Sequence, residues 1–324
     1  MSRKQYNKKR NSHSSRGNGG FAIVMIIFTI VLCYMVFCTG MPTNKTESFR
    51  PTVGEQVDNT EAHSGESEVP TESKPDPVAF ELHQIDVGCA NAYLLRYGEH
   101  SIFIDGGQSF GYKTVSNYLD NLGVAYIDFY IATHWHGDHV SNTSKILEKY
   151  AHPATVVYGP SEKPNSKYPI TKGSYSQLVA GNTFTIGEVT FTCVGPYEVK
   201  QGGNANPDSL NLVIEYGDFK ALLTGDYMYN KVIEEYPELT ENVDVLQMPH
   251  HGLDPLCISE KAFAHCNPEI VLVPANSSAP TKGLVRDLGT ETKVLDNQSG
   301  CIAIVTYGEG FKVYTGVIAS DFEY

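Results

Sequence analysis

The stretch YIDFYIATHWHGDH, residues 126–139, decides both the fold and the chemistry of this 324-residue chain. Its first eight residues are mostly apolar, aromatic or β-branched, as expected of a strand buried in a sheet. Residues 134–139 follow directly and place three imidazoles and one carboxylate within six positions. These ligand types suit borderline divalent ions such as Zn²⁺. A polar loop without a metal would be built from Asp, Asn, Ser and Gly, so the pattern predicts a metal site at the end of a strand.

Strand and helix signals alternate irregularly on both sides of that stretch. Helices are expected at residues 113–123, 144–150 and 232–236. Further strands are expected at residues 79–87, 92–97, 101–105, 155–159, 184–186, 189–195, 210–217, 220–225, 243–248, 269–275, 301–307 and 311–316. The order is neither a regular βαβ series nor all-β. We therefore expect an α/β domain over residues 79–324, with two packed sheets and helices outside them, a four-layer αββα sandwich.

The N-terminal part of the chain differs from the rest. Residues 1–20 carry six Lys or Arg and no acid, and the uncharged stretch from Phe21 to Thr39 follows them. About 20 apolar residues are enough for a helix to cross a bilayer, and a basic flank stays in the cytoplasm. The sequence predicts a basic cytoplasmic tail, a single-pass transmembrane anchor at 21–40, and an exported remainder. Residues 41–78 are rich in Pro, Glu, Ser and Thr, which predicts a disordered acidic linker.

The charge is unevenly distributed along the chain. The formal net charge is −13, of which residues 1–20 supply +6 and residues 41–78 supply −5. Taking those two parts away leaves −14 for the folded part. Such a balance excludes a protein that coats nucleic acid through basic contacts.

Cysteine usage leaves the redox chemistry of the exported part open. Its odd number of cysteines shows no C-x-x-C spacing, so that one disulfide and a set of buried free thiols fit equally well. These residues are Cys89, Cys193, Cys257, Cys266 and Cys301.

Three other segments accompany the histidine-rich stretch in a fixed order. HQIDVGCANAYLLRYGEHSIFIDGG (83–107) precedes it, and DSLNLVIEYGDFKALLTGD (208–226) and VDVLQMPHHG (243–252) follow it. THWHGDH (133–139) resembles the H-x-H-x-D-H signature of metallo-β-lactamase-fold hydrolases, and all four segments together are similar to the ComEC competence-protein branch. The resemblance covers residues 79–273 and implies the metallo-β-lactamase sandwich. Pneumococcal-type choline-phosphate esterases share the same frame.

The resemblance implies a dinuclear metal site. His134 and His136 would bind the first ion, and Asp138 and His139 would bind the second. Asp226, at the end of LLTGD, would bridge both ions, although an aspartate after Thr-Gly could also be a turn residue. Zn²⁺ is the expected metal, and Mn²⁺ is the alternative because the first site would be rich in oxygen ligands.

The paired histidines of PHHG require a choice between His250 and His251. We favour His251 as the last ligand of the second ion, because PHHG overlays the P-G-H-G turn of the fold. His250 would then face the substrate as a hydrogen-bond donor or acid. The expected catalytic residues are therefore His250 and the metal-binding Asp138.

The sequence departs from the family pattern in two places. No histidine occurs between Pro153 and Pro249, so that Asp208 or water must replace the third histidine that the classical members supply to the first ion. The ComEC branch lacks that histidine too. Asn91 stands where that branch has an acid, which keeps a hydrogen bond but loses a charge.

Other polar residues have open assignments. Asp105 could hydrogen-bond a ligand histidine and fix its tautomer, or it could be an ordinary turn aspartate before two glycines. Four isolated histidines are expected to be surface or core residues: His83, His100, His152 and His265.

Two ions about 3.5–4 Å apart can share a water, lower its pKa and stabilise the charge that develops on the attacked centre. The ligand set therefore indicates a metal-dependent hydrolase, in which a bridging hydroxide attacks a phosphodiester and His250 assists the leaving oxygen. The resemblance implies a membrane-anchored extracellular nuclease, whereas the charge of −14 favours a small or zwitterionic diester.

Two alternatives remain at the level of sequence. One is a small-molecule phosphodiesterase such as a choline-phosphate esterase, with some of the 20 tyrosines forming a cage for a quaternary ammonium. The other is a non-catalytic metal-binding surface module. The expected partners are the membrane, through the N-terminal helix, and a phosphodiester from DNA or a small molecule; the sequence indicates no obligate protein partner.

Overall fold

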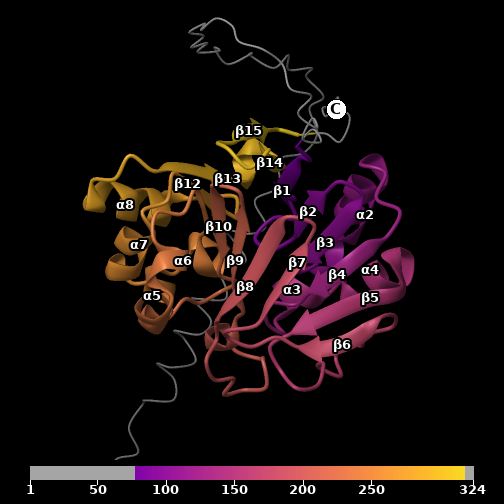
Figure 1. Ribbon diagram of the computed structural model, residues 1–324. Coiled ribbons are helices and arrows are strands. Elements are labelled where there is room, and N and C mark those ends of the chain that lie inside the picture. The colour runs from indigo at the N-terminus through magenta and orange to yellow at the C-terminus, as the bar shows by residue number, and fades with distance from the viewer. Residues whose placement is uncertain (1–76, 318–324) are drawn as a thin grey trace, which may run out of the picture. The chain divides into compact units, whose positions relative to one another are not determined.

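Figure 1 shows a computed structural model of the chain, which describes residues 77–317 apart from the side chain of Pro255. The expected tail and anchor, and nearly all of the expected linker, lie outside the described residues. Within 77–317, no helix has the length and apolar character that a bilayer-spanning segment needs.

The first sheet has eight strands, and the stretch quoted above supplies β4, two strands from one edge. In spatial order they are β15 (Lys312–Thr315), β14 (Ile302–Thr306), β1 (Phe80–Gln84), β2 (Tyr93–Tyr97), β3 (His100–Ile104), β4 (Ile127–Ile131), β5 (Ala151–Gly159) and β6 (Ser174–Gln177). The strands from β15 to β3 pair antiparallel, and those from β3 to β6 pair parallel.

The second sheet has seven strands. In spatial order they are β13 (Lys293–Asp296), β12 (Ile270–Val273), β11 (Val245–Gln247), β10 (Phe219–Leu223), β9 (Asn211–Tyr216), β8 (Val189–Gly195) and β7 (Thr183–Ile186). The strands from β10 to β13 pair parallel, and those from β7 to β10 pair antiparallel. Each of the two sheets therefore has an antiparallel part and a parallel part.

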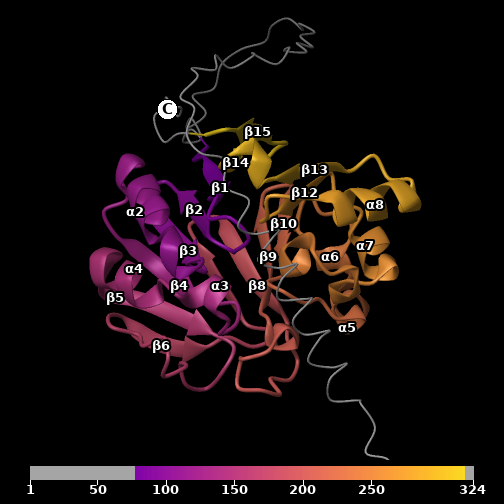
Figure 2. The same ribbon diagram turned by 180° about the vertical axis from the view of Figure 1, so that it is seen from behind.

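Helices cover the outer sides of the two sheets. Figures 1 and 2 show α2 and α4 beside the first sheet and α5 to α8 beside the second. The helices are α2 (Tyr112–Asn121), α3 (Gly137–Val140), α4 (Thr143–Tyr150), α5 (Asn230–Glu235), α6 (Pro237–Thr240), α7 (Glu260–Cys266) and α8 (Ala279–Leu288). Short 3₁₀ turns are η1 (Ser109–Gly111), η2 (Asn206–Asp208), η3 (Pro249–Gly252), η4 (Pro255–Cys257) and η5 (Asn297–Ser299).

The alternation of apolar residues along the strands explains the layers. In β2, Tyr93 and Leu95 belong to the core between the sheets, together with Leu212 and Ile214 of β9. Leu94 points the other way and packs in the core that includes the apolar residues of α2 and α4. Because successive side chains of a strand face opposite sides, one sheet can serve both cores. The α/β two-sheet sandwich predicted from the sequence is confirmed.

Candidate metal centre

The predicted metal ligands lie at the carboxyl ends of strands from both sheets. Residues 134–139 follow β4, and Asp105 follows the neighbouring parallel strand β3. In the second sheet, Asp226 follows β10, and His250 and His251 follow the parallel strand β11. Parallel strands bring their carboxyl ends to one edge of a sheet, where ligand sites commonly form. The topology therefore brings segments far apart in the sequence to one place.

Asp226 belongs to two groups of ligand atoms that could each hold an ion. Within each group, the ligand atoms lie within 4.8 Å of one another. The first group adds His134 and His136, and the second adds Asp138, His139 and His251. Six of the predicted ligands are thus brought together, and the side chain of Asp226 is shared between the groups.

The distances within these groups are short. His134 Nε2 lies 3.6 Å from Asp226 Oδ2, and His139 Nε2 lies 3.0 Å from Asp226 Oδ1. His251 Nε2 lies 3.9 Å from Asp226 Oδ1 and 3.1 Å from Asp138 Oδ2. The two carboxylates and the imidazole nitrogens therefore converge on a small volume.

The residues fit a pair of divalent ions. Three of the converging atoms are buried and have no hydrogen-bond partner among the described residues: His134 Nε2, His139 Nε2 and Asp226 Oδ1. Buried polar atoms nearly always have a partner, because leaving one without a hydrogen bond costs about 1–3 kcal/mol. Imidazole nitrogens and carboxylate oxygens are the ligands that Zn²⁺ and similar ions take. These atoms are therefore suited to metal, and which of them bind it stays a prediction.

Asp105 is held against the second group. Its Oδ2 lies 2.7 Å from His139 Nδ1, and its two oxygens accept hydrogen bonds from the Thr133 backbone N–H and hydroxyl. The residue is fully buried and has a φ of 57°, a conformation that Asp and Asn tolerate better than most residues. This geometry favours the ligand-orienting interpretation of Asp105 over the simple turn, because the bond leaves His139 Nε2 free for an ion.

Sequence reasoning missed two residues that orient the first group. Ser209 Oγ accepts a hydrogen bond from the Asp226 backbone N–H and lies 3.3 Å from His134 Nδ1. The backbone carbonyl of Asn204 lies 2.8 Å from His136 Nε2, which leaves His136 Nδ1 for an ion. The serine of the DSL segment could have been found from its position in the ComEC-like pattern, whereas a backbone carbonyl has no sequence signal.

The electrostatics of the centre favour charged carboxylates. Burial alone would raise the pKa of Asp226, but His139, His251 and His134 outweigh it and hold that pKa well below its usual value. Burial opposes the charged form of His139, yet the carboxylates of Asp226 and Asp105 raise its pKa well above the usual value. In the metal-free chain, the two carboxylates therefore favour the protonated form of His139.

This protonation state predicts that metal binding is linked to pH. A histidine must be neutral at its ligand nitrogen, so an ion must displace the proton from His139. The raised pKa of His139 favours retention of that proton in the metal-free chain. We expect the Zn²⁺ affinity of the group that contains His139 to rise with pH, and binding of an ion there to release a proton. Calorimetric titrations in buffers of different ionisation enthalpy measure this release, and a buffer-independent heat would contradict it.

Asp208 does not join the ligand groups, so that of the two roles open to it, metal ligand or supporting residue, the geometry favours the supporting role. Its buried carboxylate accepts three backbone hydrogen bonds, from the N–H groups of Lys200, Gln201 and Gly203, at 2.9–3.0 Å. Both oxygens are therefore used to hold the loop that carries Asn204. Asp208 acts on the centre only indirectly, because this loop presents its carbonyl to His136.

Replacing Asp208 by alanine is expected to destabilise the fold. Three N–H donors would lose a charged acceptor, so that the free energy of unfolding should fall by about 3 kcal/mol. Chemical denaturation measures this loss, and Asp287→Asn on the exposed surface of α8 is the control, expected within about 0.5 kcal/mol of the parent. Loss of one bound ion with an unchanged unfolding free energy would instead make Asp208 a ligand.

Unusual backbone conformations mark the loops of the centre. Gly225, just before Asp226, has a φ of 59°, and a Cβ there would lie 2.9 Å from Ser209 Cβ. His250 and His251 are consecutive residues in the left-handed region, with φ of 50° and 55°. Non-glycine residues in this region cost energy and cluster at functional sites.

The structure places His251, and not His250, in the groups around Asp226. His250 lies on the same turn but is partly exposed, and its Nδ1 is 3.5 Å from Cys257 Sγ. Burial raises the pKa of Cys257 to about 12, with the carboxylates of Asp254 and Asp226 adding to it. The thiol is therefore protonated at neutral pH and is no nucleophile by itself.

The remaining sequence expectations have plain structural outcomes. Asn91 is buried, and its backbone N–H donates to the carbonyl of Asp138, so it supports the loop that carries four of the potential metal ligands. His83 is fully buried and lies 2.8 Å from both Glu81 Oε2 and Tyr118 Oη, whereas His100 is exposed. The five described cysteines are free thiols, so the disulfide that sequence left open is not formed among them.

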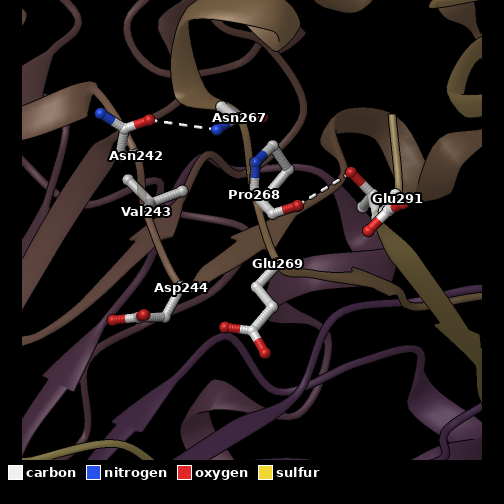
Figure 3. Close-up of a pocket in the computed structure, with 8 residues that line it drawn as sticks. Asn242, Val243, Asp244, Asn267, Pro268, Glu269 and Glu291 are labelled. Atoms are coloured by element: carbon white, nitrogen blue, oxygen red, sulfur yellow. Dashed lines mark hydrogen bonds between the residues drawn. The ribbon is translucent and has the colours of Figure 1, made fainter. Parts of the chain in front are cut away.

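A separate surface pocket lies at the opposite ends of the parallel strands. It has a volume of about 330 Å³ and is lined by acidic side chains including Asp244, Glu269 and Glu291, which Figure 3 shows. Asp244 and Glu269 precede β11 and β12, whereas His251 follows β11. The pocket is therefore distinct from the candidate centre.

Comparison with known proteins places this geometry in a family. The sequence model of the Metallo-beta-lactamase superfamily matches residues 85–271, more than half of the chain. The chain belongs to the metallo-beta-lactamase superfamily. As a metallo-beta-lactamase superfamily hydrolase, it carries its potential metal ligands in the loops after β4, β10 and β11.

Individual relatives of this superfamily are distant. The atrochrysone carboxyl ACP thioesterase AacuM of Aspergillus aculeatus is 24% identical over 245 residues, covering 71% of this chain and 69% of the relative. A lactamase-like protein of Pestalotiopsis microspora is 30% identical over 70 residues, covering 21% and 22%. The crystal structure of the metallo-beta-lactamase fold protein YhfI from Bacillus subtilis is similar with a TM-score of 0.51 and 14% identity, covering 73% of this chain and all of YhfI. That likeness shows the fold alone.

Proposed function

We propose that this superfamily member is a metal-dependent phosphodiesterase of the ComEC type. The observation that carries the proposal is the position of Asp226, whose carboxylate is shared by two groups of potential metal ligands. A carboxylate that bridges two ions is suited to hydrolysis of phosphodiesters, because two-metal sites stabilise both the attacking and the leaving oxygen.

The potential ligands would hold two ions. His134 and His136 with Asp226 would hold one ion, and Asp138, His139 and His251 with Asp226 would hold the other. Bound metal would supply Lewis-acid activation of water and substrate.

Several groups outside these ligand sets support the proposed reaction. Asp105 and Ser209 lie at the Nδ1 atoms of His139 and His134, so that the Nε2 atoms of these histidines are directed at the ions. His250, partly exposed beside the ligands, would donate a proton to the leaving oxygen through its Nε2.

The charge of the chain bears on the substrate. Residues 79–324 carry a formal charge of −14, which opposes binding of long polyanions. We propose that short oligonucleotides or small diesters are better substrates than long DNA. A second candidate is thioester hydrolysis, because the relative from Aspergillus aculeatus with 24% identity is a thioesterase.

We further propose that the enzyme works outside the cell, anchored through residues 21–40. The support is the uncharged stretch after a basic N-terminus. Protease treatment of intact cells would remove the catalytic part if the topology is as proposed, and full protection would contradict it.

The function is tested with the purified full-length chain, loaded with Zn²⁺ or Mn²⁺. Bis(p-nitrophenyl) phosphate, a short single-stranded oligonucleotide, long DNA and an acyl thioester are compared by kcat/KM. The proposal expects the diesters to be cleaved in a metal-dependent way and the thioester to be a poor substrate. A higher kcat/KM for the thioester than for the diesters would favour the second candidate. If the metal-loaded chain hydrolyses none of these esters, the result would contradict the enzyme proposal and favour a non-catalytic metal-binding module.

A further inference from the structure

A third group of ligand atoms lies beside the two that share Asp226. It consists of His250, Asp254 and Cys257, whose ligand atoms lie within 4.8 Å of one another. His250 Nδ1 is 3.5 Å from Cys257 Sγ and 3.9 Å from Asp254 Oδ2. None of the three belongs to the groups around Asp226 among the described residues.

Backbone hydrogen bonds hold this third group in place. The Asp254 side chain caps η4 by accepting the N–H of Leu256 at 2.9 Å, and the Cys257 N–H donates to the Asp254 carbonyl at 3.2 Å. The Cys257 carbonyl accepts the N–H of Met228 at 2.9 Å, which fixes the turn to the loop after Asp226. Asp254 and Cys257 are therefore held in place by backbone hydrogen bonds.

The separations of these atoms are compatible with one ion between them, although the contact of 3.5 Å between His250 Nδ1 and Cys257 Sγ is also a hydrogen bond in the metal-free chain. At 3.9 Å, the His250 nitrogen and the Asp254 oxygen are too far apart to be hydrogen-bonded. Ligands that bind one Zn²⁺ at about 2.0–2.3 Å in tetrahedral geometry are separated by about 3.3–3.8 Å. The observed separation of 3.5 Å lies in this range, and the separation of 3.9 Å needs only a small adjustment to reach it.

The donor set also has the composition and access of a zinc site. Thiolate, imidazole and carboxylate together favour Zn²⁺ or a similar borderline ion over Mg²⁺ or Ca²⁺. The side chains of His250 and Asp254 are 31% and 41% exposed, so that an ion can reach them from solvent, whereas Cys257 is buried. Three protein ligands leave a fourth position for water.

We propose that His250, Asp254 and Cys257 form a third metal site that binds a single Zn²⁺-like ion. On binding, the thiol gives its proton to solvent and the sulfur forms a bond to the ion, so that one proton is released and nothing is oxidised. The ion ties η4 to the turn that carries His251. It also occupies His250 Nδ1, so that with this ion bound the Nε2–H group can donate a hydrogen bond to the leaving oxygen, whereas full proton transfer from His250 requires the site to be without metal.

Co²⁺ titration of the metal-free full-length chain tests this site. Both groups around Asp226 lack sulfur, so a thiolate-to-cobalt charge-transfer band in the near ultraviolet reports an ion on a cysteine. We expect such a band, together with a third equivalent of bound metal. The band should disappear in Cys257→Ser and weaken in Asp254→Asn.

Two control variants show whether the band depends on Cys257 and whether it is independent of the centre around Asp226. Cys266→Ser removes a buried thiol outside every ligand group and should keep the band. Asp226→Asn should lose metal from the centre and still show the band, so that the proposed function and the third site fail separately. Absence of the band in the parent chain, or its persistence in Cys257→Ser, would overturn the proposal. If Cys257→Ser does not fold, loss of the band in His250→Ala decides the question in the same way.

Discussion

Replacing Asp226 by asparagine is expected to lower kcat/KM for bis(p-nitrophenyl) phosphate by about a thousandfold, equivalent to about 4 kcal/mol of transition-state stabilisation. The side chain keeps its size, but the amide offers one neutral oxygen where the carboxylate offers two charged ones. His134, His139 and His251 all lie within 3.9 Å of the carboxylate oxygens. Both ligand groups are therefore damaged by one substitution.

Two further readouts separate this effect from misfolding. Elemental analysis should find fewer bound ions in Asp226→Asn than in the parent. Asp218→Asn, on the exposed turn between β9 and β10, is the matched control and should keep full activity and metal content. Unchanged turnover in Asp226→Asn would rule out the shared carboxylate as the basis of catalysis.

Replacing Asp105 by alanine is expected to weaken metal binding by about 10–100-fold, the usual effect of losing a residue that orients a ligand histidine. The substitution removes the hydrogen bonds to His139 and Thr133. It also places alanine at a φ of 57°, which costs about 1–2 kcal/mol. Metal affinity is measured by competition with a chelator of known affinity.

The conservative variant Asp105→Asn shows whether orientation or charge matters. Asparagine tolerates the same backbone conformation and keeps an oxygen for His139 Nδ1, so the loss should be about 10-fold or less. Since Asp105 helps to raise the pKa of His139, that pKa should fall in both variants of the metal-free chain, which nuclear magnetic resonance can follow. Asp120→Asn, at an exposed ion pair, is the control. If both Asp105 variants bind metal as tightly as the parent chain, Asp105 does not orient a ligand and is a simple turn residue.

Local patterns explain why the core of the fold could be predicted. The strand that ends before His134 and the strand that ends before Asp226 are apolar runs broken by polar loops, and the structure has β4 and β10 there. The positions of the ligands after strand ends follow from the same patterns. Their convergence could be expected only through the family resemblance, because no local signal says which strands are neighbours.

Elements with weak local signals were not predicted. Strand β6 (SYSQ) is short and polar at the edge of its sheet, so it lacks the alternation that marks a half-buried strand. Helix α8 contains Pro280 and Gly283, which weaken a helical pattern, and β13 after it is only four residues long. Tertiary packing decides these elements.

The errors at the site have a similar cause. Asp208 or water was expected to replace a histidine of the family at the first ion, but the side chain of Asp208 is turned to the backbone of residues 200–203. Side-chain direction in an irregular loop cannot be obtained from residue type. The contact between His250 and Cys257 was also missed, because it depends on two consecutive left-handed residues in the PHHG turn.

The central claim is that Asp226 joins two ions in one centre. Electron paramagnetic resonance of the chain loaded with Mn²⁺ tests it most directly, because two Mn²⁺ ions bridged by one carboxylate are magnetically coupled. The cysteine-containing third group has little affinity for Mn²⁺ and should not interfere. We predict the spectrum of a coupled pair in the parent chain and its loss in Asp226→Asn. A spectrum of isolated ions alone in the parent chain would contradict the account.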